Sequence, residues 1–158
     1  MPQVRYGYDV FLSHNSADKE WVRHLADRLA SVSYNGRPLR PWLDENVLDP
    51  GLPSSNAELT SAMDLSRVLA LVHSPEAIAS YWVQFEIDYF NQNRGDDHIL
   101  VLHRRPADLP KGLTTTCAAI DFEHADRFDA LVAALCPPPK VTVEDVQSQM
   151  KMVFKAVL

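Results

Sequence analysis

The chain has 158 residues, 46% of them hydrophobic and 23% charged, which is enough for one globular core and too little for two. The formal net charge of −6 argues against a surface for nucleic acid or for an anionic membrane. The two cysteines lack zinc or disulfide spacing, and neither an apolar signal core nor a run long enough to span a bilayer occurs. We therefore expect one cytoplasmic domain with reduced thiols.

The first third of the chain predicts a strand, a helix and a second strand. The segment 8–13 is aromatic and branched in its middle, as a strand requires, and Asp18 is placed to cap the helix that follows. The apolar positions of that helix recur with helical period: Trp21, Val22, Leu25, Ala26 and Leu29. After a turn at Asn35-Gly36, residues 39–43 form a second strand, which Pro41 places near a sheet edge or at a strand start.

The middle of the chain begins with a long loop, about Asp44 to Ser54, that contains the turn dipeptide Pro50-Gly51. Ser54 or Ser55 then caps a helix. The inward positions expected for this helix are Leu59, Ala62, Met63 and Leu65.

A nearly unbroken apolar run, residues 68–72, predicts a strand buried on both faces. Ser74 and Pro75 are suited to the N-cap and first turn of a helix that ends near Gly95. Trp82 and Glu86 lie four residues apart and therefore share a face of this helix. From the spacing alone, a solvated Glu beside a core Trp is the more common arrangement, and a sugar site beside a flat cationic base is the functional alternative.

The last third predicts strands at 99–102 and 118–122 and a helix at 128–135. Three prolines at 137–139 then form a stiff break. Beyond them Thr142 caps a final helix with an apolar stripe. We expect this helix either to begin a further region of a longer protein or to pair with a partner; packing back on the domain is the alternative.

Five alternations of strand and helix predict an α/β fold, an open and mostly parallel sheet with helices on both faces. Ligands of such folds lie at the carboxyl ends of the strands, where this chain has Ser13, His14, Asp44 and Ser74. No glycine-rich phosphate motif occurs, and the six histidines form no metal-ligand spacing. We expect no metal and no cofactor.

Three segments resemble, in order, the signature boxes of the Toll/interleukin-1 receptor (TIR) domain: YDVFLSH at 8–14, LDE at 43–45 with LDPG at 48–51, and SP at 74–75 with SYWVQFE at 80–86. The resemblance covers roughly residues 6 to 136. It implies a flavodoxin-like, five-stranded parallel sheet, a TIR domain over 1–136, and a linker and helix over 137–158. It also implies self-association with other TIR domains through the loop after the second strand.

The resemblance further implies a function, because many bacterial TIR domains cleave NAD⁺ at the nicotinamide–ribose bond in immune defence or NAD-depletion signalling. It makes Glu86 the catalytic residue and Trp82 its pocket neighbour. The candidate substrate contacts are Ser13, His14, Asp44, Asp49 and Gly51. Asp44 as a cap and Gly51 as a turn residue are structural alternatives. Two departures concern substrate positioning: His14-Asn15 replaces a common basic or aromatic residue, and Val83 replaces a common cysteine.

Such chemistry needs one carboxylate, because nicotinamide leaves the cationic substrate as a neutral molecule and requires no general acid. Glu86 would stabilise positive charge that develops on the ribose. NAD⁺ would be a substrate, converted to nicotinamide and either linear or cyclic ADP-ribose. A catalytically silent TIR scaffold that acts by protein–protein contact is the alternative function.

Overall fold

The structure is a computed structural model that describes residues 6–44, 56–114, 117–138 and 143–157. Its main sheet has five parallel strands in the order β4-β1-β5-β6-β7. Their bounds are Tyr8–Ser13 for β1, Pro41–Trp42 for β4, Ser66–His73 for β5, Ile99–His103 for β6 and Ala118–Asp121 for β7. This is the 2-1-3-4-5 order of flavodoxin-like sheets, so the predicted fold is confirmed.

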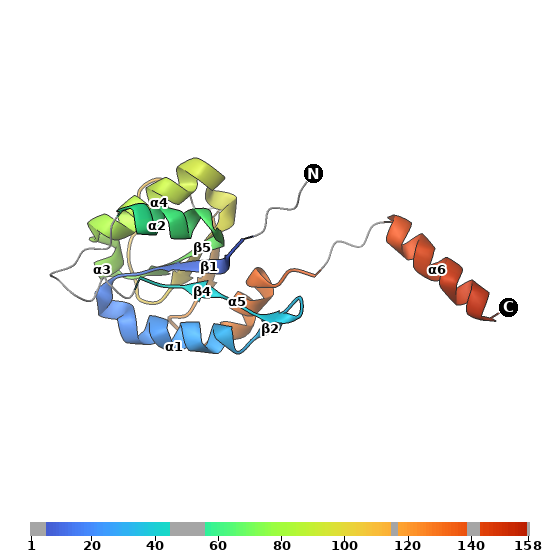
Figure 1. The fold of residues 1–158 in the computed structure, drawn as a ribbon. Coiled ribbons are helices and arrows are strands. Elements are labelled where there is room, and N and C mark those ends of the chain that lie inside the picture. The colour runs from blue at the N-terminus through green and yellow to red at the C-terminus, as the bar shows by residue number, and fades with distance from the viewer. Residues whose placement is uncertain (1–5, 45–55, 115–116, 139–142, 158) are drawn as a thin grey trace.

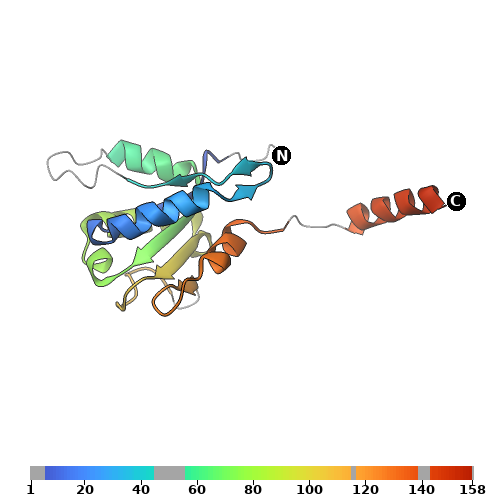
Figure 2. The same cartoon turned by 90° about the horizontal axis from the view of Figure 1, so that it is seen from below.

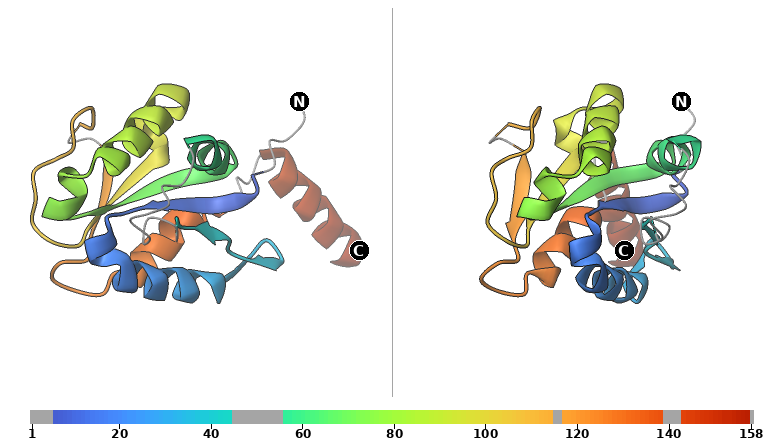
Figure 3. Two further views of the ribbon diagram at one scale, coloured as in Figure 1. Left: turned by 60° about the vertical axis from the view of Figure 1, so that its left-hand side comes forward. Right: turned by 90° about the vertical axis from the view of Figure 1, so that its left-hand side faces the viewer.

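Helices cover both faces of the sheet (Figure 1). The helices α1 (Lys19–Ala30) and α5 (Phe128–Leu135) lie on one face. The other face carries α2 (Asn56–Asp64), α3 (Pro75–Ile78) and α4 (Tyr81–Arg94) (Figure 3). Each face therefore has its own apolar core. The central strand β5 contributes to both cores, which is why its segment 69–72 is fully buried.

The edge strand β4 is shorter than the predicted segment 39–43 and begins at Pro41. Within the described part of the chain it pairs with β1 alone, so the missing N–H of the proline breaks no central ladder. Before it, the predicted Asn35-Gly36 turn joins two short antiparallel strands, β2 (Ser33–Tyr34) and β3 (Arg37–Pro38). Both turn residues have positive φ, 52° and 80°, as a tight hairpin requires.

Three local predictions are wrong. The helix expected from Pro75 onward is broken in two, because Ser80 starts a new helix by accepting a hydrogen bond from the Val83 N–H. Asp18 precedes α1 but makes no capping hydrogen bond, since its carboxylate is used elsewhere in the fold. Leu65 follows the end of α2 and is 45% exposed instead of packing inward.

The C-terminal helix α6 (Val143–Val157) forms as predicted. It lies apart from the rest of the chain (Figure 2), with apolar side chains in solvent, so packing back on the domain is not observed. The exposed apolar residues of α6 are Val143, Val146, Met150, Met152, Val153 and Phe154. Within the described residues, no helix has the length and apolar character to cross a membrane. The division at residue 136 into a domain and a separate tail stays a prediction.

Candidate active site

The candidate catalytic residue Glu86 lies on α4 and meets Ser13 at the carboxyl end of β1. The Ser13 hydroxyl donates a 2.5 Å hydrogen bond to Oε2 of Glu86, which joins two of the signature segments. Glu86 is 4% exposed and Ser13 is 1% exposed. The spacing from Trp82 by itself favoured a solvated Glu86, and this is wrong: α4 turns the side chain into the protein beside its buried residues Val83 and Ile87.

Burial determines the charge state of Glu86. It raises the pKa of this carboxyl to about 8, although the hydrogen bond from Ser13 favours the ionised form. The negative charge of Asp44, which follows β4, adds to the increase in pKa. At neutral pH this carboxyl is therefore mostly protonated, and a cation bound beside it would favour ionisation.

His14, the residue after β1, offers an unused hydrogen-bond acceptor. Its Nδ1–H donates to the Leu12 carbonyl oxygen at 2.9 Å, which leaves Nε2 with the lone pair of a neutral imidazole. Burial lowers the pKa of His14, against the opposing effects of that hydrogen bond and of Asp18 and Asp44. Nε2 is buried, and no described residue hydrogen-bonds to it. Because a buried acceptor without a partner is costly, this atom is a credible contact for a ligand hydroxyl.

Of the other predicted site residues, Asp44 and Trp82 are described by the structure and Asp49 and Gly51 are not. Asp44 is 6% exposed and lies at the same edge of the sheet as Ser13 and His14. Trp82, in the first turn of α4, is half-buried and packs against the core on that face of the sheet. Its ring contacts are with Tyr81 and Phe85. A contact between this ring and a substrate stays a prediction. Asp49 and Gly51 lie outside the described residues, as do the rest of the loop 45–55 and the two candidate capping serines.

Sequence reasoning missed a polar network at the same edge. The Ser74 hydroxyl donates to Asp18 at 2.6 Å, and Arg105 forms ion pairs with both Asp18 and Glu76. The sequence predicted Asp18 only as a helix cap and Ser74 as a cap at the carboxyl edge of the sheet, without a bond between them. The one available signal was that both follow strands whose carboxyl ends are adjacent in a parallel sheet. Arg105, which comes two residues after β6, gave no such signal.

One group of potential metal ligands occurs in the described part of the chain, at Asp121, Glu123 and His124. All three are exposed, and their ligand atoms lie within 4.8 Å of one another. Asp121 already accepts hydrogen bonds from the Glu123 N–H and from Nδ1 of His124, both at 2.8 Å. These contacts are those of a hydrogen-bonded turn after β7.

The parallel 2-1-3-4-5 sheet and the buried acid beside its carboxyl edge define a doubly wound α/β domain with a site at the expected place. Residues 10–136 match the family of TIR domains. The chain therefore belongs to the TIR domain family.

Two curated relatives are bacterial. The chain is 31% identical over 103 residues to the 2′ cyclic ADP-D-ribose synthase AbTIR of Acinetobacter baumannii. The aligned region covers 65% of this chain and 36% of that protein. It is also 30% identical over 97 residues to the NAD(+) hydrolase TirS of Staphylococcus aureus. This second alignment covers 60% of this chain and 32% of that protein. The chain thus spans about a third of the length of either relative.

Among solved structures, the TIR domain of the Toll-related receptor TRR-2 from Hydra magnipapillata is similar, with a TM-score of 0.54 and 21% identity. The similarity covers 81% of this chain and 90% of that domain. At this identity it supports the fold alone.

Proposed function

We propose that this TIR domain hydrolyses or cyclises NAD⁺ by breaking the nicotinamide–ribose bond, with Glu86 as its essential carboxylate. The observation that carries the proposal is the buried hydrogen bond between Glu86 and Ser13, which brings two signature segments together at the ligand-binding edge of the sheet. The names of the two bacterial relatives support the same reaction class.

Each described residue has a definite task in this proposal. The ionised Glu86 carboxylate stabilises the positive charge that grows on the ribose as the neutral nicotinamide departs. Ser13 holds that carboxylate in place through its hydroxyl. Nε2 of neutral His14 accepts a hydrogen bond from a ribose hydroxyl, which gives its unused lone pair a partner.

The raised pKa of Glu86 fits a site that is activated by its substrate. A carboxyl with a pKa of about 8 is mostly neutral at pH 7. The cationic nicotinamide ring of NAD⁺ would favour the ionised form on binding, because an opposite charge nearby lowers the pKa of an acid. The carboxylate would then be present mainly when there is a charge for it to stabilise.

Self-association belongs to the proposal as the step that opens or completes the site. In a single chain Glu86 and Ser13 are almost fully buried, so a neighbouring subunit or a rearranged loop has to create access for the substrate. The same burial is the observation that favours the alternative function. A TIR scaffold would keep Glu86 neutral and enclosed and would act only through contacts with other TIR domains.

The test measures nicotinamide release from NAD⁺ over a range of protein concentrations, with a crowding agent. We expect turnover per subunit to rise with concentration, and Glu86→Gln to reduce it on the order of 10²-fold or more, because Gln keeps the shape but not the charge. The control is Glu20→Gln, which removes an exposed carboxylate from α1 on the opposite face of the sheet.

Undiminished turnover in Glu86→Gln would remove this residue from the mechanism. A parent protein that releases no nicotinamide at any concentration, while it still self-associates, would establish the scaffold function instead.

A further inference from the structure

A groove with an excess of positive charge lies at the opposite end of the sheet from Glu86. It is a cavity of about 780 Å³ beside the start of β1 and β5, and the β2–β3 hairpin forms one wall. Ser13 ends β1 and Asp9 lies near its start, so the groove is about 13 Å along the strand from the candidate active site. The groove is therefore independent of the proposed function.

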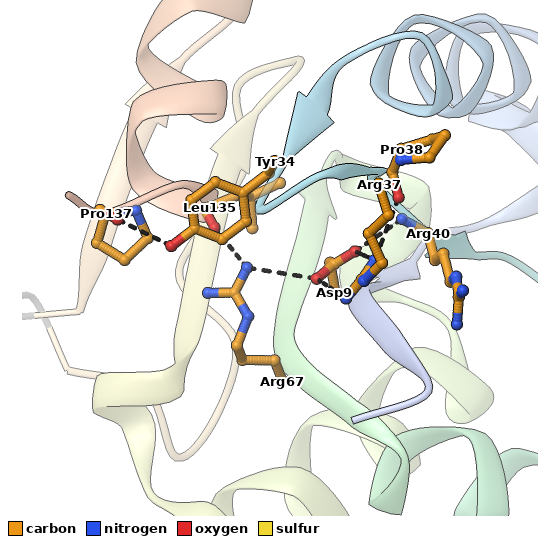
Figure 4. Close-up of polar contacts among 8 residues, drawn as sticks. All are labelled: Asp9, Tyr34, Arg37, Pro38, Arg40, Arg67, Leu135 and Pro137. Atoms are coloured by element: carbon orange, nitrogen blue, oxygen red, sulfur yellow. Dashed lines mark hydrogen bonds and ion pairs between the residues drawn. The ribbon is translucent and has the colours of Figure 1, made fainter. Parts of the chain in front are cut away.

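The groove is built around the buried carboxylate of Asp9, which is 3% exposed. Arg37 forms a two-pronged ion pair with it, at 2.9 and 3.1 Å (Figure 4). Arg67 approaches from another side, with its Nη2 at 3.7 Å from Asp9, and the same nitrogen donates to the Leu135 carbonyl oxygen. The backbone N–H of Arg40 donates to Asp9 at 2.8 Å. Asp9 thus orders the guanidinium groups of Arg37 and Arg67 and the backbone of Arg40, whose side chain extends away from the carboxylate along the groove (Figure 4).

The charges of this cluster do not balance. Among the described residues that line the groove, three are arginines and Asp9 is the one acid. Arg37 alone is sufficient to neutralise Asp9, since it uses both terminal nitrogens on that carboxylate. Arg67 keeps Nη1 and Nε without a described partner, and the exposed guanidinium of Arg40 has none. Two cationic side chains with unused donors therefore remain on a protein whose net charge is −6.

We propose that this groove binds a phosphate-bearing anion of charge −2 or more. Arginine forks match phosphate oxygens, and two excess guanidinium groups match two negative charges better than a single carboxylate would. The rings of Tyr6 and Tyr34 also line the groove, and Arg67 lies 6.0 Å from the centre of the Tyr34 ring. These rings offer flat contacts to an organic group attached to the phosphate. Inorganic polyphosphate and a nucleotide are the two sources of this chemistry.

Titration calorimetry at low ionic strength, with inorganic pyrophosphate as the probe, tests the proposal. We expect saturable binding that weakens as salt is added, because the contact is between charges at the surface. Arg40→Glu should raise the dissociation constant about tenfold or more. Its side chain is exposed and makes no hydrogen bond or ion pair with the residues that the structure describes, and its backbone N–H is retained, so we expect the variant to keep the fold. Arg40→Gln should also raise the dissociation constant, but by a smaller factor.

Arg23→Glu is the matched control, since it makes the same charge change at an exposed position on α1 outside the groove. Equal weakening by Arg40→Glu and Arg23→Glu, or no saturable binding by the parent protein, would overturn the proposal. A second titration with adenosine diphosphate distinguishes the sources. Tighter binding than that of pyrophosphate, lost in Arg40→Glu, assigns a nucleotide, and equal affinity assigns the phosphate groups alone.

Discussion

The two ends of β1 hold two buried carboxylates in opposite electrostatic states. At the start of the strand, burial raises the pKa of Asp9, but the hydrogen bonds from Arg37 and the Arg40 N–H and the nearby charges outweigh it and lower the pKa overall. At the far end, burial raises the pKa of Glu86 to about 8, because only the Ser13 hydroxyl opposes it and Asp44 adds a like charge. The same strand thus positions one acid that is charged at pH 7 and one that is mostly neutral at this pH.

The difference separates an acid that maintains the fold from one that is available for chemistry. Asp9 is tied to a cation by short contacts, so its charge is already satisfied. Glu86 is held without a cationic partner among the residues that the structure describes, which costs stability when the group ionises. A cationic substrate supplies the missing partner. The comparison therefore predicts opposite responses to pH and to removal of the two charges.

The largest expected effect is on the pH dependence of catalysis. If the ionised form of Glu86 acts, kcat/KM should rise roughly tenfold for each pH unit below about 8 and level off above it, since this parameter reports the free protein. Burial lowers the pKa of His14 from its usual value of 6.5, so His14 is mostly neutral above pH 7 and the change between pH 7 and 8 is assigned to Glu86. Nicotinamide release at low NAD⁺ between pH 6 and 9, corrected for spontaneous hydrolysis, checks this. A flat profile would mean that the free carboxylate is already ionised.

A smaller effect is expected from Asp9→Asn, which should lower the free energy of unfolding at pH 7 by about 2 kcal/mol. This is less than the loss typical of a fully buried pair, because the side chain of Arg37 is 36% exposed. The pKa of Asp9 is lower in the folded state than the unfolded value of 3.8, so its charge stabilises the fold fully above that value. This stabilisation is lost as the pH falls through the folded-state pKa. Urea unfolding should therefore show the full difference at pH 7 and a smaller one as the pH falls below 3.8. Asp27→Asn, at an exposed position on α1, should change neither value.

Glu86→Gln should raise the free energy of unfolding, by an amount similar to or smaller than the loss in Asp9→Asn. The folded-state pKa is raised from 4.5 to about 8, so the parent loses stability as the pH rises between these values, while the neutral Gln does not. The variant should be more stable than the parent by about 2 kcal/mol at pH 8 and by almost nothing at pH 4, after part of the gain is lost to a weaker bond with Ser13. Thermal unfolding at both pH values measures this. Destabilisation at pH 8 would show that Glu86 is held charged, like Asp9.

Most of the fold could be predicted from local signals in the sequence. The strands of the main sheet and the long helices could be recognised from local patterns, such as the apolar run 68–72 and the helix end at Gly95. The Asn35-Gly36 turn likewise predicted the reversal that joins β2 and β3. The break between α3 and α4 was not predicted, because a single Ser is tolerated inside a helix although it is favoured at an N-cap, where Ser80 lies. The identity of Glu86 as the candidate acid followed from resemblance to the TIR family, and the spacing from Trp82 by itself favoured a solvated residue.

What the sequence by itself determined is therefore the order of the elements, the sheet they form and the residues that reach its carboxyl edge, since these depend on neighbours along the chain. Only the tertiary structure decided that Glu86 is buried against Ser13, that Asp18 joins Ser74 instead of capping α1, and that Asp9 gathers arginines from β3 and β5. These contacts join residues that are between 28 and 73 positions apart. Burial and charge at such distances depend on how the layers pack, and no short segment of sequence carries that information.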